Sequence, residues 1–544
     1  MATMGCTGRS GLRQFVNGRF PRVRGRWLAA AAVISAVVGP SAVRAQSDPT
    51  VRVSGGVIRG LLTDGGGAAF KGIPYAEPPV GDLRWREPIP AHAWTGIRDA
   101  TRFGAICPQN PSATIPNAVE IAKEDCLFLN VWIPTWPITG NRPVLLWIPG
   151  GGNINGGTSE ARHDGSLLAR RGVVVVTINY RLASFGFFSH PALTAESPHR
   201  TSGNQGLLDQ VAALDWVRAN ISRFGGDPNA ITVGGVSAGG VDTTALMTSP
   251  LTKGKFRAAI VQSGPARNVL GDPLPREEAE RRGSTHTASW NAAANASLRV
   301  LRAIPVATIL KSQPLRPVAH LNLSVDGYAL PMPPADVFAS GRQHPVPAIM
   351  GSTVRDFTPG APPPTGLATL IDDYYGPLAV RATPLYAVAD PRNGTPEVQW
   401  ATDMAFRCGT VLQLTQHTAA GNRAFAYQFA RLTTPEIQPG GNIHGLDGGY
   451  VLGTFAARDT GTKLVPIEFA PSDQMLSDLM QQYWVNFVRT GDPNGSGLPA
   501  WPAFGSPSGG FMHFLPTGPA AEERLRRAHC DIYIENVARV AQRR

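Results

Sequence analysis

TVGGVSAGGVD, residues 232–242, places one serine among four glycines directly after a short β-branched run. Residues 231–233 are typical of a strand, and the residues after the serine are compatible with a helix. Gly235, Ser237 and Gly239 match the G-x-S-x-G pattern, in which a serine on a sharp strand-to-helix turn exposes its hydroxyl. Taken alone the pattern is a weak signal, because any glycine-rich turn can match it.

Outward from this stretch, apolar runs alternate with helical patterns. The runs typical of strands are residues 144–148, 173–178, 231–233, 258–261, 347–350 and 425–429. Residues 207–221 carry apolar side chains at helical spacing. Strands that are apolar on both faces and separated by helices predict a mainly parallel sheet with helices on both sides. The sequence therefore predicts the α/β class.

A glycine run, PGGGN at residues 149–153, follows the first of these strands. Backbone amides in such a run can bind the negative charge that develops on a carbonyl oxygen. A flexible turn is the alternative interpretation. The combination with the serine motif favours anion binding and makes Gly151, Gly152 and Ala238 the candidate donors.

A serine hydroxyl is a poor nucleophile unless a base accepts its proton and a carboxylate orients that base. Asp356 follows the run 347–350 and is the candidate acid, although solvation or an ion pair with Arg355 would also explain it. His444 lies in the loop-like stretch GGNIHGLDGG and is the candidate base. The other late histidines are more simply structural: His417, His513 and His529.

The N-terminus has the features of an export signal. Residues 1–45 contain seven arginines, no lysine and no acidic residue, and residues 27–38 are an apolar run too short to span a bilayer comfortably. The pattern predicts a signal peptide at 1–45 with cleavage between Ala45 and Gln46, and a membrane anchor is the alternative. We therefore expect a secreted or periplasmic protein with no stable membrane insertion.

Composition excludes several other classes. With 43% hydrophobic and 16% charged residues the chain is typical of a globular protein. Removing the seven arginines of the signal peptide lowers the formal net charge from +11 to +4. The rest of the chain has no basic run interleaved with aromatic residues, so we expect no nucleic-acid partner.

The cysteines agree with export. After loss of Cys6 four remain, an even number, which predicts two disulfides in an oxidising compartment. No C-x-x-C motif or His/Cys cluster is present, so we expect neither a metal site nor a cofactor.

Beyond the serine motif, five segments follow a family pattern in order. They are FKGIPYAEPPVGDLRWREP (70–88), EDCLFLNVWIP (124–134), NYRLASFGF (179–187), GNQGLLDQVAALDWVRANISRFGGDPNAITVGGVSAG (203–239) and YWVNFVRTGDPN (483–494). Over nearly its whole mature length the chain resembles the type B carboxylesterases, the cholinesterase-like branch of the α/β-hydrolases. The resemblance implies the α/β-hydrolase fold, with one catalytic domain over 46–544. We expect long excursions, above all 265–345, to form the pocket rim.

The resemblance also implies roles for individual residues. Ser237 would be the nucleophile, His444 the general base and Asp356 its orienting acid. Gly151, Gly152 and Ala238 would form the oxyanion hole, and Asp447 and Ser263 match positions that the family uses around the histidine. The implied disulfides are Cys107–Cys126 and Cys408–Cys530.

Four departures from the family bear on the site. Val236 stands where Glu is usual, Pro149 where His or Tyr is frequent, and Asn153 where Phe is common. We expect Val236 and Asn153 to line the pocket. The triad acid is Asp356 where Glu is usual, which requires a slightly different approach of its loop to the histidine.

Loss of the glutamate removes a charge that would repel an anionic substrate, so we expect tolerance of acidic acyl groups and poor choline-ester activity. The tricarballylate esters of fumonisin-type toxins are one candidate for such a small-molecule substrate. The alternatives are a lipase acting on neutral acyl esters and a non-catalytic binding protein with the same fold. Residues 358–366 are rich in proline and lie either near the cleft or in an exposed connection. The sequence predicts no oligomeric state.

Overall fold

Eleven strands form the central sheet within the part of the chain that the computed structural model describes. That part comprises residues 48–112, 115–268, 271–314, 318–357, 366–432, 443–454, 458–459, 464–465, 470–505, 510–523 and 525–542. The predicted signal peptide, 1–45, and nearly all of the proline-rich stretch 358–366 lie outside the described residues.

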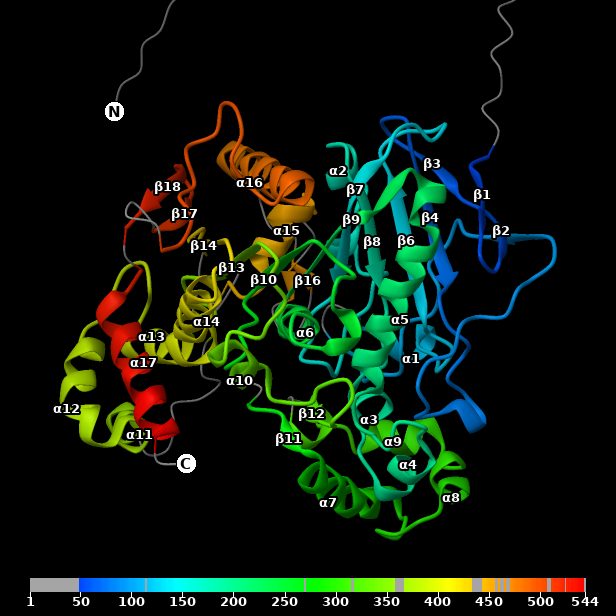
Figure 1. Ribbon diagram of the computed structural model, residues 1–544, viewed down its shortest axis with the longest axis horizontal. Coiled ribbons are helices and arrows are strands. Elements are labelled where there is room, and N and C mark those ends of the chain that lie inside the picture. The colour runs from blue at the N-terminus through cyan, green and yellow to red at the C-terminus, as the bar shows by residue number, and fades with distance from the viewer. Residues whose placement is uncertain are drawn as a thin grey trace, which may run out of the picture. The chain divides into compact units, whose positions relative to one another are not determined.

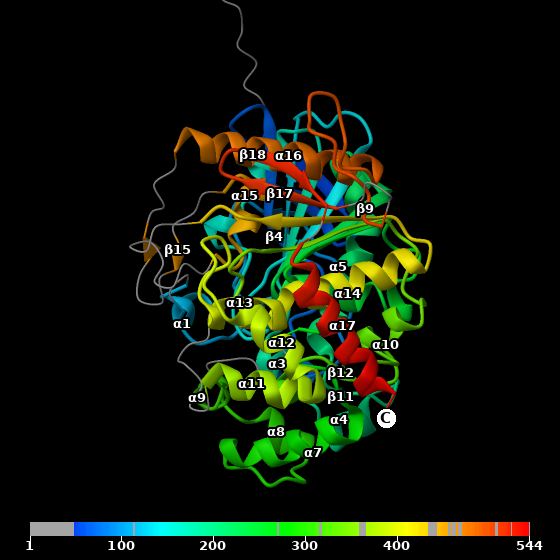
Figure 2. The same ribbon diagram turned by 90° about the vertical axis from the view of Figure 1, so that its left-hand side faces the viewer.

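The middle of the sheet is parallel and its edges are antiparallel (Figures 1 and 2). In spatial order the strands are β18 (Gly518–Glu522), β17 (Phe511–Leu515), β14 (Ala424–Phe429), β13 (Ala348–Thr353), β10 (Ala258–Gln262), β9 (Gly226–Val236), β7 (Arg142–Ile148), β8 (Val174–Ile178), β6 (Phe128–Ile133), β4 (Gly67–Pro74) and β3 (Leu61–Thr63). Every pairing from β8 across to β17 is parallel. The predicted α/β class and mainly parallel sheet are confirmed.

Helices cover both faces of this sheet, as Figures 1 and 2 show from two directions. One face carries α5 (Gln205–Asn220), α6 (Ala238–Leu246) and α14 (Cys408–Ala419), and the other carries α2 (Ser166–Ala169), α15 (Leu446–Leu452) and α16 (Pro471–Thr490). No helix in the described ranges is both long and apolar enough to cross a membrane.

The two-residue period of a strand explains the two layers of core. On β7, Leu146 belongs to the hydrophobic cluster that contains Leu214 and Val217 of α5. Its neighbour Trp147 belongs to the opposite cluster, which contains Trp484 of α16. Because both faces are buried, β7 reads as a continuous apolar run rather than an alternating one.

Two helical excursions extend from the helix-covered sheet on the side of α5 and α6 (Figure 1). The first has α3 (Ala183–Gly186), α4 (Pro191–Glu196), α7 (Arg276–His286), α8 (Leu298–Arg302), α9 (Val306–Lys311) and α10 (Pro334–Ala339), with β11 (Leu274–Pro275) and β12 (Ser324–Val325). The second has α11 (Gly366–Tyr375), α12 (Ala379–Ala382), α13 (Pro396–Thr402), the π-helical turn η9 (Asp403–Arg407) and α17 (Arg527–Ala541). Each excursion has its own apolar cluster, one around Trp290 and one around Trp400.

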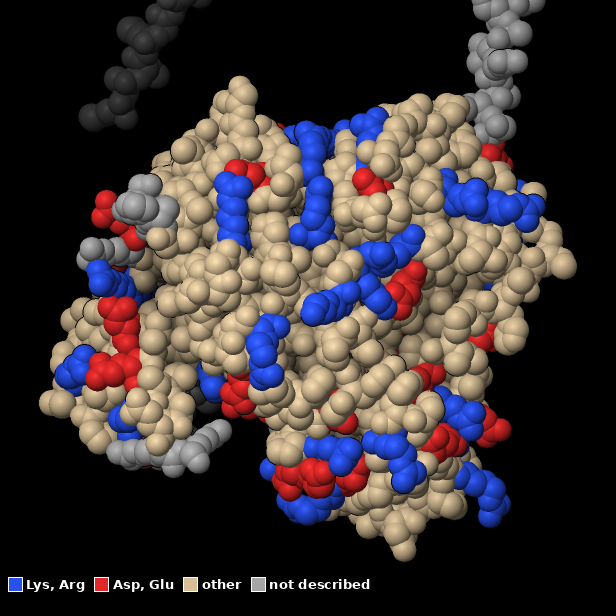
Figure 3. Space-filling model, in the orientation of Figure 1, with Lys and Arg blue, Asp and Glu red and all other residues tan. Residues whose placement is uncertain are grey.

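The remaining elements are short. They are β1 (Thr50–Val53), β2 (Gly56–Arg59), β5 (Ile97–Asp99), α1 (Ala118–Ile121), β15 (Arg458–Asp459) and β16 (Leu464–Val465), with the 3₁₀ turns η1 (Gly81–Leu83), η2 (Ala161–His163), η3 (Ile221–Phe224), η4 (Pro250–Thr252), η5 (Thr287–Trp290), η6 (Ala319–Leu321), η7 (Gly376–Leu378) and η8 (Thr383–Tyr386). Residues Asp48–Arg544 form one compact unit. On the face in Figure 3, charges of both signs are interspersed, most densely over α7 at the bottom.

Candidate active site

Ser237 lies at the sharp turn between β9 and α6. Its backbone adopts φ 59° and ψ −127°, a conformation that costs a non-glycine residue roughly 1–3 kcal/mol. The Ser237 amide donates to the Gln262 carbonyl at the end of β10, 2.8 Å away, which helps to hold the turn. The predicted strand-to-helix turn is therefore present, with its serine in a strained conformation.

The glycines beside Ser237 allow the neighbouring backbone to pass very close. A Cβ on Gly239 would lie 2.0 Å from the Ile148 carbonyl oxygen of β7. A Cβ on Gly235 would lie 2.6 Å from the same oxygen. Both contacts are shorter than real Cβ atoms tolerate, so any larger residue would push β7 away from the turn.

His444 bridges Ser237 and Asp356. Its Nε2 is 2.7 Å from the Ser237 Oγ, and its Nδ1 is 2.5 Å from the Asp356 Oδ1. The three residues follow β9, β13 and β14, whose carboxyl ends meet at one edge of the parallel sheet. An imidazole held in this way can accept the hydroxyl proton on one nitrogen while the carboxylate fixes the other.

Asp356 is fully buried and held by the residues beneath it. Its Oδ2 accepts hydrogen bonds from the Ser263 hydroxyl at 2.6 Å and the Thr353 amide at 3.0 Å. Arg355 points elsewhere and donates to the carbonyls of residues 391 and 392. The ion pair with Arg355, considered above as an alternative for Asp356, does not form.

Asp447 supports the chain just after His444. It lies in the first turn of α15, and its Oδ2 accepts from the Tyr427 hydroxyl at 2.5 Å and the Gln262 amide nitrogen at 2.8 Å. Burial raises the pKa of Asp447, the Tyr427 hydrogen bond opposes this, and Asp356 adds to the rise. Of the two positions assigned around the histidine, Asp447 therefore lies under its loop, whereas Ser263 contacts the acid.

The glycine loop after β7 lies directly against the serine turn. A Cβ on Gly150 would be 2.5 Å from the Val236 carbonyl oxygen and 3.0 Å from the Ser237 Cβ. The amides of Gly151, Gly152 and Ala238 donate to no acceptor within the described residues. Unpaired amides beside a serine are what an oxyanion site requires.

Comparison with known proteins agrees with this geometry. The model of the carboxylesterase family matches residues 47–363 and 391–533. The chain is 34% identical to a fumonisin B1 esterase of Sphingopyxis macrogoltabida, over 87% of this chain and 88% of that protein. It is also 34% identical to a para-nitrobenzyl esterase of Bacillus subtilis, over 82% of this chain and 91% of that protein.

The chain belongs to the carboxylesterase family.

Solved structures agree. A Geobacillus stearothermophilus carboxylesterase matches with a TM-score of 0.76 and 30% identity, over 90% of this chain and 99% of the other. A para-nitrobenzyl esterase matches with a TM-score of 0.73 and 31% identity, over 88% and 97%. The α/β-hydrolase fold is confirmed, and this carboxylesterase acts on carboxylic ester bonds of small molecules.

Two residues expected to line the pocket of this carboxylesterase are buried in the structure. Asn153 is fully buried, and its side chain forms hydrogen bonds inside the protein instead of facing open space. Val236 is 8% exposed and belongs to the hydrophobic cluster with Trp147. A Cβ on Gly445 would lie 3.8 Å from its Cγ2, so Val236 packs against the loop that carries His444. Sequence proximity to Ser237 therefore does not determine how much of a side chain is exposed, and the lining of the pocket by these two residues stays a prediction.

Asn153 is part of a buried polar network around Asp242, a residue of α6 that no sequence motif marks as functional. The Asn153 Nδ2 donates to the Asp242 Oδ1 at 3.1 Å, and the Gln210 Nε2 donates to the Asp242 Oδ2 at 2.6 Å. Burial raises the pKa of Asp242 to about 7, opposed by hydrogen bonds from Asn153, Gln210 and Tyr180. The carboxylate is thus buried among neutral groups.

The turn η9, before α14, supports the histidine and the acid loop from the other side. The Phe406 ring stacks on the His444 imidazole, with centroids 5.0 Å apart and planes 14° apart. The Phe357 amide donates to the Thr402 hydroxyl at 3.2 Å. Such π-turns insert one extra residue into a helix and occur often at functional sites. Nothing in the sequence pattern marks Phe406 or the π-turn that contains it.

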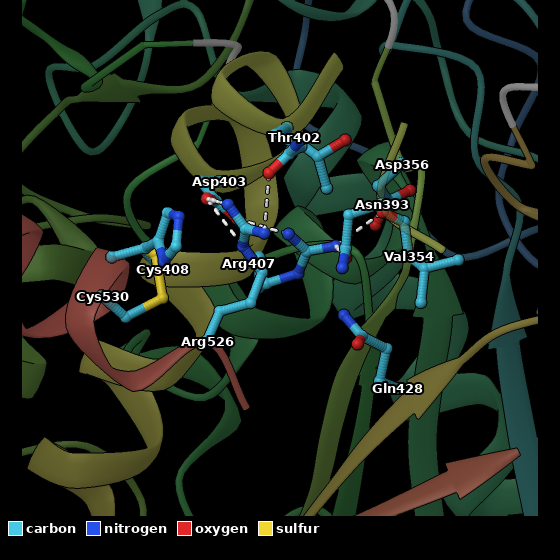
Figure 4. Close-up of polar contacts among 12 residues, drawn as sticks. Val354, Asp356, Asn393, Thr402, Asp403, Arg407, Cys408, Gln428, Arg526 and Cys530 are labelled. Atoms are coloured by element: carbon cyan, nitrogen blue, oxygen red, sulfur yellow. Dashed lines mark hydrogen bonds and ion pairs between the residues drawn. A yellow bond between two sulfur atoms is a disulfide. The ribbon is translucent and has the colours of Figure 1, made fainter. Parts of the chain in front are cut away.

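Arg407 is completely buried beneath the same loop (Figure 4). It forms an ion pair with Asp403, and its guanidinium donates to the Val354 carbonyl at 2.6 Å. The Asp403 Oδ2 also accepts a hydrogen bond from the Arg526 Nε at 3.2 Å. Figure 4 shows these charged groups between Asp356 at one end and a disulfide at the other.

Both disulfides join the pairs that the family resemblance implies. Cys107 is bonded to Cys126, and Cys408 is bonded to Cys530. The second ties the start of α14, directly after Arg407, to α17. It therefore links the C-terminal helix to the turn that supports His444 and Asp356.

The other late histidines have structural partners. His417 contacts the Val346 carbonyl at 2.9 Å, His513 contacts Glu522 at 2.8 Å, and His529 contacts the Leu385 carbonyl at 2.8 Å. Among the described residues, no group of three or more His, Cys, Asp or Glu side chains is placed to hold a metal ion.

Proposed function

We propose that this carboxylesterase cleaves esters by two-step acyl transfer through Ser237, His444 and Asp356. The observation that supports this most directly is the pair of contacts made by His444, 2.7 Å to the Ser237 Oγ and 2.5 Å to the Asp356 Oδ1. As the serine oxygen attacks the ester carbonyl, the His444 Nε2 accepts its proton. The buried Asp356 carboxylate keeps the Nδ1 proton in place and stabilises the imidazolium.

The amides of Gly151, Gly152 and Ala238 would stabilise the resulting oxyanion. When the tetrahedral intermediate collapses, the leaving alcohol takes the proton from His444 and the acyl group stays on Ser237. Water then attacks the acyl-enzyme and gives a proton to the same imidazole, and the acid is released with Ser237 restored. Each donor pre-aligned with the oxyanion is worth roughly 10²–10³ in kcat.

Labelling with a p-nitrophenyl phosphonate tests the nucleophile. We expect a burst of one equivalent of nitrophenol and a phosphonyl group on the peptide that contains Ser237. The variants Ser237→Ala and His444→Ala should lose activity by roughly 10⁴-fold or more, with unchanged melting temperature. Activity retained in Ser237→Ala, or a label on another residue, would contradict the mechanism.

We further propose that the preferred acyl groups are anionic polycarboxylates, such as the tricarballylate esters of fumonisin-type toxins. The similarity to a fumonisin B1 esterase supports this. So does Val236, where the family usually has Glu. Because Val236 packs against the His444 loop, a carboxylate there would join buried Asp356 and Asp447 and make the site more negative. Its absence lowers the repulsion of an anionic acyl group.

A matched pair of substrates tests the charge preference. Both are p-nitrophenyl monoesters of tricarballylic acid, one with its two other carboxyls free and one with both as primary amides. We expect a higher kcat/KM for the free acid. Val236→Glu should lower that preference by about tenfold, equivalent to about 1.4 kcal/mol, whereas the neutral control Val236→Gln should leave it unchanged. A preference for the amide in the parent enzyme would disprove the substrate proposal while leaving the triad intact.

We also propose that the protein is exported. Two disulfides within the described residues fit an oxidising compartment, where such bonds persist. N-terminal sequencing of protein recovered outside the cytoplasm should begin at Gln46. Recovery of full-length chain from the cytoplasm with reduced cysteines would contradict export.

A further inference from the structure

The glycine loop is held in place by a side chain with an unusual backbone conformation. Asn153 ends the loop with φ 59°, after Gly151 and Gly152, which also have positive φ. Asparagine tolerates this left-handed region better than most residues because its short side chain can form nearby hydrogen bonds. Here the side-chain oxygen accepts from the Tyr180 hydroxyl at 2.9 Å, and the Nδ2 donates to Asp242 and Asn322, each at 3.1 Å. Every polar atom of the Asn153 side chain is therefore satisfied.

The loop is also held at its beginning. The Tyr180 hydroxyl, which contacts Asn153, lies 3.1 Å from the Pro149 carbonyl. Tyr180 lies shortly after β8, and its phenol contacts both the first and the last residue of the loop 149–153. Asn322 comes from the excursion 265–345, which in this way reaches the site.

Asp242 connects this loop to the nucleophile helix. It lies on α6, five residues after Ser237, and is fully buried. Its Oδ1 binds Asn153, and its Oδ2 binds Gln210 of α5 at 2.6 Å. The proposed oxyanion donors come from two separate elements, Gly151 and Gly152 from the loop and Ala238 from the start of α6. The Asp242–Asn153 hydrogen bond spans the two.

We propose that Asp242 is a positioning residue for the oxyanion site, because through Asn153 it fixes the glycine loop relative to α6. This inference rests on the proposed acyl-transfer mechanism, since the spacing of these amides matters only if an oxyanion forms between them. It adds to that mechanism a dependence on the charge of a carboxylate that touches neither the substrate nor the triad.

No cation compensates the Asp242 carboxylate among the described residues. Its hydrogen-bond partners are the amides of Asn153 and Gln210 and the Tyr180 phenol, whose own pKa is raised well above its usual value by burial and by Asp242. On the neighbouring segments, Asp209 of α5 and Arg181 after β8 form an ion pair with each other, at 2.7 Å. The pKa of Asp242, raised by burial to about 7, is consistent with this neutral surrounding.

Protonation would weaken the connection in a specific way. A carboxylate accepts from both Asn153 and Gln210, whereas a neutral acid must donate on one side. The Gln210 Oε1 is buried without a partner within the described residues, so this amide can turn to accept the new proton. Asn153 would then donate to a neutral carbonyl, and hydrogen bonds to a charged acceptor are roughly twice as strong. The loop would be held less firmly below about pH 7.

The test is the pH dependence of kcat and KM for p-nitrophenyl butyrate in the full-length enzyme and in Asp242→Asn. At pH 8 we expect kcat to fall about tenfold to a hundredfold in the variant, with KM changed less than about twofold, because the loss affects the transition state. Below about pH 7 the ratio of the parent's kcat to the variant's kcat should fall towards one, since Asp242 gains a proton that the amide of the variant cannot bind.

Two further variants separate positioning from folding. Asn153→Gly removes the side chain without straining the backbone, so it should fold and reproduce the fall in kcat, and combining it with Asp242→Asn should add little. Thr243→Val removes a hydroxyl that bonds only the Gly239 carbonyl within α6 and should keep the parent kcat. An Asp242→Asn enzyme with the parent kcat and pH slope, or an equal loss in Thr243→Val, would overturn the inference. Ser237→Ala tests the underlying mechanism separately.

Discussion

Asp242 and Asp403 are both fully buried carboxylates, but their surroundings differ in one respect. Asp242 bonds to the neutral amides of Asn153 and Gln210. Asp403 lies between two guanidinium groups, those of Arg407 and Arg526. The first connects the glycine loop to the nucleophile helix, and the second supports the loop that carries Asp356.

The difference shows how the same residue type can be buried either among neutral groups or between two cations. Burial alone penalises an ionised carboxylate and raises its pKa towards neutrality, as at Asp242. A buried cation beside the carboxylate offsets that penalty and makes both charges dependent on each other. We therefore expect a change of pH to act on the network around Asp242. The removal of one charged partner should act on the cluster around Asp403.

The largest effect should come from breaking the charged cluster. Arg407→Met leaves Asp403 buried with one cation fewer and frees the Val354 carbonyl, so we expect the free energy of unfolding to fall by about 3–5 kcal/mol. Chemical denaturation measures this. The double variant Asp403→Asn/Arg407→Met removes both charges and should regain part of the stability but not the kcat, because the acid loop stays unsupported. A single variant as stable as the parent would show that the pair does not compensate burial.

The neutral network should instead give a pH-dependent effect on stability. Because the folded-state pKa of Asp242 lies above its ordinary value, the folded protein holds a proton that the unfolded chain has lost between about pH 4 and pH 7. The parent's free energy of unfolding therefore falls as pH rises through this range, and Asp242→Asn avoids that loss. The stability of the variant relative to the parent should rise by on the order of 2–4 kcal/mol from pH 4 to pH 8.

Asp403→Asn provides the contrast for this measurement. It leaves Arg407 and Arg526 without their carboxylate, so it should be destabilised at both pH values. If the two aspartate variants showed the same dependence on pH, the distinction between the networks would not hold.

A smaller effect should come from the aromatic contact on the acid side. Phe406→Ala removes the ring stacked on His444 and should lower kcat by about tenfold, with a modest change in KM, because the imidazole gains freedom to turn away from Ser237. Phe406→Tyr keeps the stacking face and is the control. Steady-state kinetics at pH 8, where both variants should be folded, decide between them.

The smallest effect should follow loss of one neutral donor to Asp356. Ser263→Ala removes the 2.6 Å hydrogen bond to Oδ2 but leaves the Thr353 amide in place. We expect a loss in kcat of about threefold to tenfold, in line with about 1 kcal/mol for a single hydrogen bond. If Ser263→Ala lowered kcat as much as Arg407→Met does, the hydroxyl rather than the charged cluster would position Asp356.

Several features of the site were predictable because short segments specify them. Glycine is required at positions 235 and 239, because a Cβ at either position would lie within 2.6 Å of the Ile148 carbonyl oxygen of β7. The turn at Ser237 is therefore apparent from a few residues. Continuous apolar runs such as residues 144–148 indicate strands buried on both faces, and the parallel sheet follows from their spacing. Asp356 and His444 were found because each comes soon after such a strand.

The surroundings of Asn153 and of η9 were not predictable in this way. Asn153 is only a few residues beyond β7, yet its direction depends on Asp242 and Asn322, which lie 89 and 169 residues away in the chain. Phe406 and Arg407 read as an ordinary helix, and their roles appear only when η9 packs against the loops of Asp356 and His444.

By itself, the sequence determined the α/β class, the turn at Ser237 and the order in which serine, acid and histidine occur, because backbone geometry and strand burial depend on neighbouring residues. The tertiary structure alone decided that Val236 and Asn153 are buried and that Asp242 and Asp403, also buried, have opposite electrostatic surroundings. Those properties depend on which distant side chains share a buried volume, and the desolvation and pairing that set a buried charge exist only once the chain is folded.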